Sequence, residues 1–169
     1  MTKKIAITGP ESTGKSTLTK SLAGYYNSKF VKEFARDYLY HLERDYNSDD
    51  LLFIAKNQLK SENQVLCGND KFLFVDTELI NIKIWSLHKY GFCDSWILDN
   101  IKKQDYSLYL VCDVDIPWTF DTLRENPDRR EYFRNWFIRE LEYYGFPYKI
   151  ISGNESERLE KAINYIEHI

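Results

Sequence analysis

Short apolar runs alternate with longer amphipathic segments along this chain of 169 residues. Runs of this length are typical of buried strands, whereas apolar residues at helical spacing in the longer segments indicate helices. Such an alternation predicts an α/β fold, a mostly parallel sheet with helices on both faces. The five predicted strands cover residues 3–8, 29–33, 71–76, 107–113 and 148–152.

The segments between these runs have the features of helices. Two of the predicted helices have recognisable starts. Ser48 is followed by two acidic residues, which are favourable in a first turn, and Asn154 is followed three residues later by Glu157, as in a capping box. The predicted helices span 15–27, 34–43, 51–66, 78–90, 93–103, 129–144 and a last segment after Asn154.

Polar residues follow the predicted strands at the positions where ligands bind in parallel sheets. In such sheets the binding crevice lies outside the carboxyl ends of the strands. We therefore expect these residues to converge on one cleft: Gly9 to Ser16, Glu33 with Arg36, Asp76 with Glu78, and Asp113 with Asp115.

The composition narrows the class of protein. The length suits one domain spanning residues 1–169, and a net charge of −3 argues against binding nucleic acid by general electrostatics. Cys67, Cys93 and Cys112 are scattered and lack metal-ligand spacing, so they indicate reduced thiols of a cytoplasmic protein. The apolar run Ile5–Ile7 is too short for a signal peptide or a membrane span.

The stretch "GPESTGKST" provides the strongest chemical signal. It fits the phosphate-binding pattern G-x-x-x-x-G-K-[ST], with a strand before it and a helix after it, and this context favours a phosphate loop over an ordinary glycine turn. Lys15 is expected to reach the terminal phosphates of ATP, and the Ser16 hydroxyl to bind Mg²⁺. The predicted nucleotide-binding residues are Gly9, Pro10, Glu11, Ser12, Thr13, Gly14, Lys15, Ser16 and Thr17.

Two acidic positions are candidates for chemistry at the same edge of the sheet. Asp76 ends an apolar strand, where it can bind Mg²⁺, through water, or accept a proton; the alternative is a helix cap. Glu33 can hold or deprotonate a substrate hydroxyl while Arg36 steadies phosphate; the alternative is a surface pair on a helix.

An arginine-rich segment, "TLRENPDRREYFR", lies between the fourth strand and a helix. It suits a lid that closes over phosphates during transfer, and the alternative is a solvated face. Its arginines are Arg124, Arg129, Arg130 and Arg134. The aromatic residues Trp85, Tyr90 and Trp118 are candidates for stacking against a base, although core positions are the more common use of such residues.

The chain resembles the NadR-type ribosylnicotinamide kinase domain and its stand-alone relatives. "GPESTGKST", "EFARDY", "FVDTE", "KYG", "CDVDIPWTFDTLR" and "GFPYKIISG" occur in the family's order and extend over nearly the whole chain. The resemblance implies a P-loop kinase fold with an arginine-rich lid. It also implies transfer of the γ-phosphoryl group of ATP, with Mg²⁺, to the 5′-hydroxyl of nicotinamide riboside.

The resemblance also implies roles for individual residues. The expected catalytic residues are Lys15, Glu33, Asp76, Arg124 and Arg130, with Asp121 on the lid. The expected acceptor-binding residues are Glu33, Arg36, Asp76, Glu78 and Tyr90, and the metal ligands Ser16 and Asp76.

The sequence departs from the family at two points. Nothing supplies the adenylyltransferase motif of the bifunctional members, and Lys32 stands where the family has a tryptophan, an aromatic face suited to a cationic ring. A kinase of another nucleoside, or an ATP-binding regulatory module without turnover, are therefore the alternatives. A switch GTPase is disfavoured because no N-K-x-D segment is present. The acceptor, the general base and the oligomeric state stay open.

Overall fold

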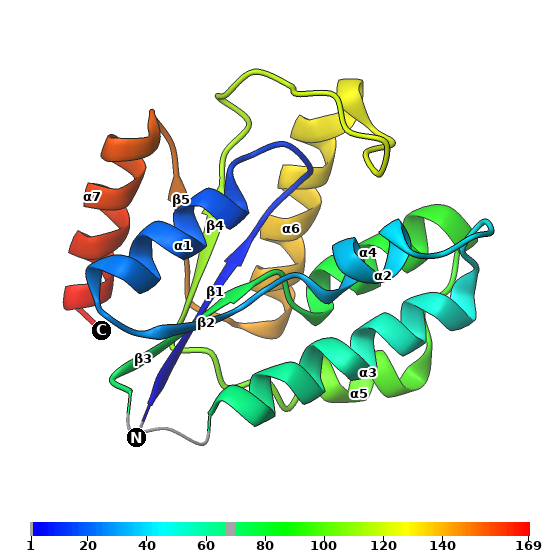
Figure 1. Cartoon of the computed structure of the whole chain (residues 1–169), viewed down its shortest axis with the longest axis horizontal. Coiled ribbons are helices and arrows are strands. Elements are labelled where there is room, and N and C mark those ends of the chain that lie inside the picture. Colours follow the sequence, from blue (N-terminus) through cyan, green and yellow to red (C-terminus); the bar gives the residue numbers. More distant parts are fainter. Residues whose placement is uncertain (1, 67–69) are drawn as a thin grey trace.

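Five strands form one sheet in the order β2-β3-β1-β4-β5, and every neighbouring pair is parallel. The computed structural model describes residues 2–66 and 70–169. Figure 1 shows the sheet at the centre of the molecule, with the carboxyl end of β1 pointing toward the loop that precedes α1. The predicted parallel sheet is confirmed. Its strands are β1 (Lys3–Thr8), β2 (Lys29–Val31), β3 (Phe72–Asp76), β4 (Leu108–Cys112) and β5 (Tyr148–Ile151).

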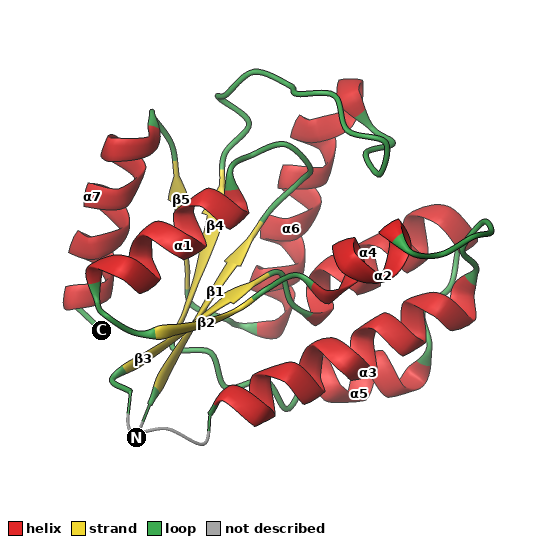
Figure 2. Ribbon diagram, in the orientation of Figure 1, coloured by secondary structure: helices red, strands yellow, loops and turns green. Residues whose placement is uncertain are grey.

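Helices cover both faces of the sheet, as predicted (Figure 2). On one face lie α1 (Lys15–Tyr25) and α7 (Glu155–Glu167), which contact each other. The other face carries the remaining helices, and a short 3-10 turn, Pro127–Arg129, precedes α6. These helices are α2 (Phe34–Tyr40), α3 (Ser48–Val65), α4 (Leu79–Tyr90), α5 (Ser95–Ile101) and α6 (Arg130–Tyr144).

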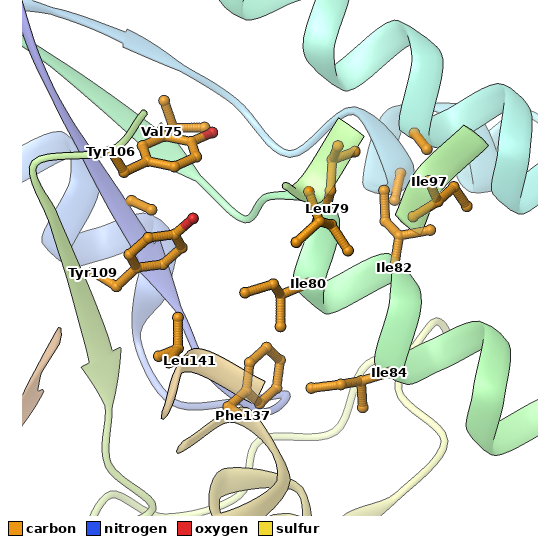
Figure 3. Close-up of a cluster of buried hydrophobic side chains, with 14 of the residues drawn as sticks. Val75, Leu79, Ile80, Ile82, Ile84, Ile97, Tyr106, Tyr109, Phe137 and Leu141 are labelled. Carbon is orange, nitrogen blue, oxygen red and sulfur yellow. The ribbon is translucent and has the colours of Figure 1, made fainter. Parts of the chain in front are cut away.

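Alternation along the strands divides the core between the two faces. On β1, Ile5 and Ile7 join the cluster under α1 and α7, whereas Ala6 joins the cluster on the opposite face. Successive side chains of a strand point to opposite faces, so a fully buried strand has apolar residues at every position. Figure 3 shows the second cluster, where Tyr109 of β4 lies beside Leu141 of α6 and Ile80 of α4.

Both predicted helix starts are found in the structure. Asn154 caps α7 and forms the predicted capping box with Glu157. Helix α3 begins at Ser48, as predicted, and its capping residue is Asn47, whose side chain accepts the backbone N–H groups of Asp49 and Asp50. The Asp50 carboxylate returns a bond to the Asn47 N–H at 2.8 Å, so this end also forms a capping box.

Two of the three cysteines lie in the described part of the chain. Cys112 is buried and Cys93 is half-buried, and both are free thiols, whereas Cys67 lies outside the described residues. Among the helices in residues 2–66 and 70–169, none has the length and apolar character required to traverse a bilayer.

Candidate active site

The loop between β1 and α1 has the backbone shape of a phosphate cradle. Gly9 has φ of 128°, and a Cβ there would lie 2.9 Å from the Cys112 carbonyl oxygen, so only glycine fits. Gly14 has φ of 79° and precedes α1 directly, and no side chain caps that helix. The first amides of α1 are therefore free to bind an anion.

Side chains within the loop hold this shape. The buried Thr13 hydroxyl donates to the Pro10 carbonyl at 2.7 Å, and the Lys15 ammonium group donates to the same oxygen at 2.7 Å. Lys15 thus lies folded across the mouth of the loop, where its charge faces the cradle. This placement agrees with the predicted role of Lys15 toward terminal phosphates.

Ser16 and Asp76 meet next to the cradle, although sixty positions separate them in the sequence. The Ser16 hydroxyl donates to Asp76 Oδ2 at 2.5 Å, while Asp76 Oδ1 is buried and has no hydrogen-bond partner among the described residues. Burial raises the pKa of Asp76, and the Ser16 hydrogen bond and the Lys15 charge oppose the rise. A carboxylate oxygen without a partner beside a hydroxyl fits Mg²⁺, which takes oxygen ligands and keeps several waters.

The described residues contain no group of side chains that could bind a metal ion without a nucleotide. Within residues 2–66 and 70–169, no three histidine, cysteine or carboxylate side chains gather in a metal-binding arrangement. This matches the way in which Mg²⁺ binds in phosphoryl-transfer sites, through one or two protein groups together with the substrate phosphates.

Glu33 lies between β2 and α2 and lines the same cavity as the phosphate loop. Burial is the main cause of its raised pKa; the nearby Lys15 charge opposes the rise and the Asp76 charge adds to it. Arg36, one turn into α2, forms an ion pair with Asp121 of the loop after β4. Glu33 and Arg36 both line the cavity that contains the phosphate loop, in line with the expected convergence on one cleft.

A cavity of about 240 Å³ extends from the phosphate loop into a pocket with apolar walls. Helix α4 contributes Asn81, Trp85 and His88 from one face, because residues three and four apart lie on the same side of a helix. One end of the cavity is thus polar and suits phosphate, while the other end suits a flat apolar ring. The other apolar wall residues are Ala35, Leu39, Ile84, Leu123, Phe133 and Phe137, and the loop after β4 adds Arg124, Glu125 and Asn126.

The arginine-rich segment lies against the phosphate loop. Arg124 lines the cavity and donates to the Ser12 hydroxyl at 3.3 Å. Arg130 donates to the carbonyl oxygens of Ser12 and Ile116 at 3.0 and 2.9 Å, which joins the loop after β4 to the cradle. Arg124 is placed to contact phosphate directly, whereas Arg130 is placed to support the loop.

Three residues expected near the acceptor lie outside the cavity wall. Glu78 is fully buried, caps α4 by accepting the Ile80 N–H at 2.7 Å, and has its pKa raised to about 8 by burial. The cap of α4 is therefore Glu78 rather than Asp76. The Tyr90 hydroxyl donates to the Tyr46 carbonyl, and Lys32 is exposed. None of the three is a cavity-lining residue, and neither is Asp76, which was also expected to bind the acceptor.

The expectation that Asp113 and Asp115 join the cleft also differs from the structure. Asp113 pairs with Arg134 of α6 at 2.8 Å, and Asp115 pairs with Arg158 of α7. Both carboxylates are therefore occupied in holding helices against the end of β4.

Arg158 is the supporting residue that sequence reasoning missed. It is buried on α7 and donates to Gly153 O at 2.7 Å, to Asp113 O at 3.1 Å and to the Thr13 carbonyl inside the phosphate loop. Arg158 falls on the same helical stripe as Ala162 and Ile166, so a charged residue on an otherwise apolar stripe was the available signal.

Comparison with known proteins places the chain in a family. A family model described as an AAA domain matches residues 4–158. The chain is 30% identical over 147 residues to the trifunctional NAD biosynthesis/regulator protein NadR of Escherichia coli (strain K12). The alignment covers 83% of this chain and 36% of NadR, so the chain spans only a part of that relative.

Solved structures share the fold. A crystal structure of NadR protein in complex with NR superposes with a TM-score of 0.79 at 23% identity, covering 99% of this chain and 49% of that chain. A thymidylate kinase from Ehrlichia chaffeensis superposes with a TM-score of 0.69 at 15% identity, covering 98% of both chains. The fold is that of the P-loop kinases.

Proposed function

The chain belongs to the AAA domain family, and we propose that it is an ATP-dependent kinase acting on the 5′-hydroxyl of nicotinamide riboside. The likeness to NadR, in sequence and in fold, supports this substrate and a place in NAD metabolism.

One observation supports the proposal more than any other. A single cavity contains the phosphate loop, two charged groups suited to a hydroxyl acceptor, Glu33 and Arg36, and an aromatic wall. A module that only binds ATP needs the first of these features but not the other two. A kinase needs all three, because donor phosphate and acceptor hydroxyl must meet in line.

The charges around the cradle suggest a division of roles. Lys15 and Arg124 neutralise negative charge that develops on the transferring phosphoryl group. Ser16 and Asp76 would hold Mg²⁺, which would offset the negative charge of the phosphate oxygens. Glu33 accepts the proton of the acceptor hydroxyl, and its raised pKa makes it a stronger base than an exposed glutamate.

The position of Trp85 supports a cationic acceptor ring. Trp85 lines the cavity, whereas Lys32 is exposed and outside the wall, so a pyridinium ring need not approach that lysine. A cation over a tryptophan face gains roughly 0.5–2 kcal/mol. Trp85 thus provides the aromatic face that the substitution at position 32 removes.

A coupled assay for ADP release tests the proposal. With nicotinamide riboside and Mg²⁺, we expect acceptor-dependent ADP release that Lys15→Ala abolishes, with nicotinamide mononucleotide as the product by mass spectrometry. A panel of neutral nucleosides in the same assay identifies a different acceptor. ATP binding measured by calorimetry, without ADP release for any acceptor, would instead identify a regulatory module.

A further inference from the structure

The Tyr46 hydroxyl connects two parts of the structure that border the cavity. Tyr46 lies in the connection between α2 and α3, and its hydroxyl oxygen accepts the Trp85 indole N–H at 2.8 Å. The same oxygen lies 3.1 Å from both carboxylate oxygens of Glu125, in the loop after β4. The rings of Tyr46 and Trp85 meet edge to face, with centroids 5.0 Å apart.

The direction of these hydrogen bonds is fixed by the groups involved. An indole N–H only donates and a carboxylate only accepts, so the Tyr46 hydroxyl accepts from Trp85 and donates to Glu125. Burial is the main cause of the raised pKa of Tyr46, which keeps its proton in place. Lys89 Nζ lies 3.4 Å from Glu125 Oε1 and 3.6 Å from the Tyr46 ring centre, so it balances the carboxylate charge.

Glu125 is attached to the phosphate loop as well. Its backbone N–H donates to the two Glu11 carboxylate oxygens at 3.2 and 3.1 Å, and the Asn126 N–H donates to Glu11 at 3.1 Å. A continuous series of contacts therefore runs from Glu11 through Glu125 and Tyr46 to the indole of Trp85. Its two ends are the phosphate side and the aromatic wall of one cavity.

We propose that Tyr46 is a positioning residue that fixes the Trp85 indole for the acceptor ring and ties it to the closed loop carrying Glu125. The effect that we expect on the acceptor KM rests on the proposed kinase function. Without the hydroxyl, the indole loses its hydrogen-bond partner. The Glu125 carboxylate loses the Tyr46 hydrogen bond and keeps its contact with Lys89. The acceptor then meets a wall that is no longer held in one orientation.

Tyr46→Phe tests the proposal because it keeps the ring and removes only the hydroxyl. We expect the KM for the acceptor to rise about tenfold, which equals 1.4 kcal/mol, with kcat and the KM for ATP changed less than twofold. Tyr40→Phe, on an exposed tyrosine of α2, is the matched control and should change neither constant. Thermal unfolding of each variant checks that the fold is retained.

Combining variants tests whether Tyr46 acts through Trp85. In a Trp85→Leu background, Tyr46→Phe should raise the acceptor KM no further, because residues acting through one another are not additive. A full additional tenfold rise in that background, or no change in the acceptor KM in Tyr46→Phe alone, would overturn the proposal.

A second measurement needs no turnover. The four tryptophans give indole N–H resonances in a ¹⁵N-labelled protein, and Trp85→Phe assigns the one from Trp85. Tyr46→Phe should shift that resonance and speed its exchange with solvent, leaving the other three unchanged. An unshifted Trp85 resonance would refute the hydrogen-bond series even in an active enzyme. Failure of the kinase function would appear separately, as absence of ADP release in the unmodified protein.

Discussion

The two sides of the cavity are built by different means. On the phosphate side the backbone makes the site. Gly9 approaches β4 too closely for any side chain, Gly14 turns the chain into α1, and Arg158 holds the loop through the Thr13 carbonyl oxygen. The positive φ angles and the close backbone approach exclude most residues other than glycine, so the geometry of the phosphate loop is fixed.

On the acceptor side the side chains make the site. Trp85 comes from α4, Phe133 and Phe137 from α6, and Leu39 from α2. No residue of these three helices has a positive φ, so the backbone there does not restrict which side chain faces the cavity. The acceptor side is therefore where the same fold can change its substrate.

This contrast predicts different outcomes for substitutions on the two sides. Changes on the phosphate side should reduce stability or turnover for every acceptor. Changes on the acceptor side should alter the affinity for particular acceptors and leave ATP binding unaffected.

The largest effect is expected for Arg158→Leu. Removing one partner of a buried ion pair costs about 3–5 kcal/mol, and we expect the lower end because the Asp115 side chain is 35% exposed. The loop carbonyl of Thr13 loses its donor as well, so the KM for ATP should rise. Urea unfolding gives the stability, and the coupled assay gives the KM.

Arg139→Leu is the matched control, because Arg139 is exposed on α6. It should change stability by less than about 0.5 kcal/mol. If Arg158→Leu is as stable as this control, the phosphate loop does not depend on α7 and the contrast between the two sides is weaker than described.

Lys15→Ala should have the next largest effect. Removal of a charge that stabilises the transferring phosphoryl group is expected to lower kcat on the order of 10²-fold or more. Unfolding should be nearly unchanged, because the Lys15 ammonium group is held by a hydrogen bond to the Pro10 carbonyl oxygen on the part-buried loop and does not belong to the hydrophobic core. Lys60→Ala, on the exposed face of α3, serves as the control. Near-normal turnover in folded Lys15→Ala would remove the loop from the mechanism.

The same contrast explains which parts of the site could be predicted from sequence. The phosphate side is readable because its backbone needs glycine and lysine at fixed spacing, and because apolar runs revealed β1 and β3. Ser16 and Asp76 were matched correctly as neighbours, since parallel strands end at one edge.

The residues of the acceptor wall could not be predicted from the sequence in this way. Asn81 and His88 join the wall only because α4, α6 and α2 converge, and that convergence is a tertiary feature with no local sequence pattern. Glu78 was assigned to the acceptor because it follows a strand. Its carboxyl group instead caps α4, a local role that strand-end reasoning does not distinguish from a functional one.

Glu33→Gln tests the proposed general base, which acts where the phosphate side and the acceptor side of the cavity meet. We expect kcat/KM for the acceptor to fall about 10²-fold, the low end for loss of a general base, with ATP affinity unchanged. A base acts when deprotonated, so activity of the unmodified enzyme should rise with pH through the Glu33 pKa, which burial places above its usual value. The acid limb of the pH–rate profile should be absent in Glu33→Gln.

Asp76→Asn provides the comparison for that variant. Because a neutral amide is a weaker ligand for Mg²⁺, the Mg²⁺ concentration for half-maximal rate should rise. If Glu33→Gln raises the Mg²⁺ requirement to the same extent, the two carboxylates do not divide into a metal side and an acceptor side.

The smallest effect is expected for Trp85→Leu, and it tests whether the acceptor side selects by charge. Loss of a cation–π contact of 0.5–2 kcal/mol should raise the KM for nicotinamide riboside about 2- to 30-fold, with the KM for ATP unchanged. The reduced riboside, whose ring is uncharged and similar in shape, should lose less affinity, because leucine retains apolar contact. Phe120→Leu, at an exposed position in the loop after β4, should have no effect. Equal losses for the charged and uncharged ribosides would mean that Trp85 contributes area alone. In that case the recognition of a cationic ring would have to come from the acidic groups of the cavity, Glu11, Glu33 and Glu125.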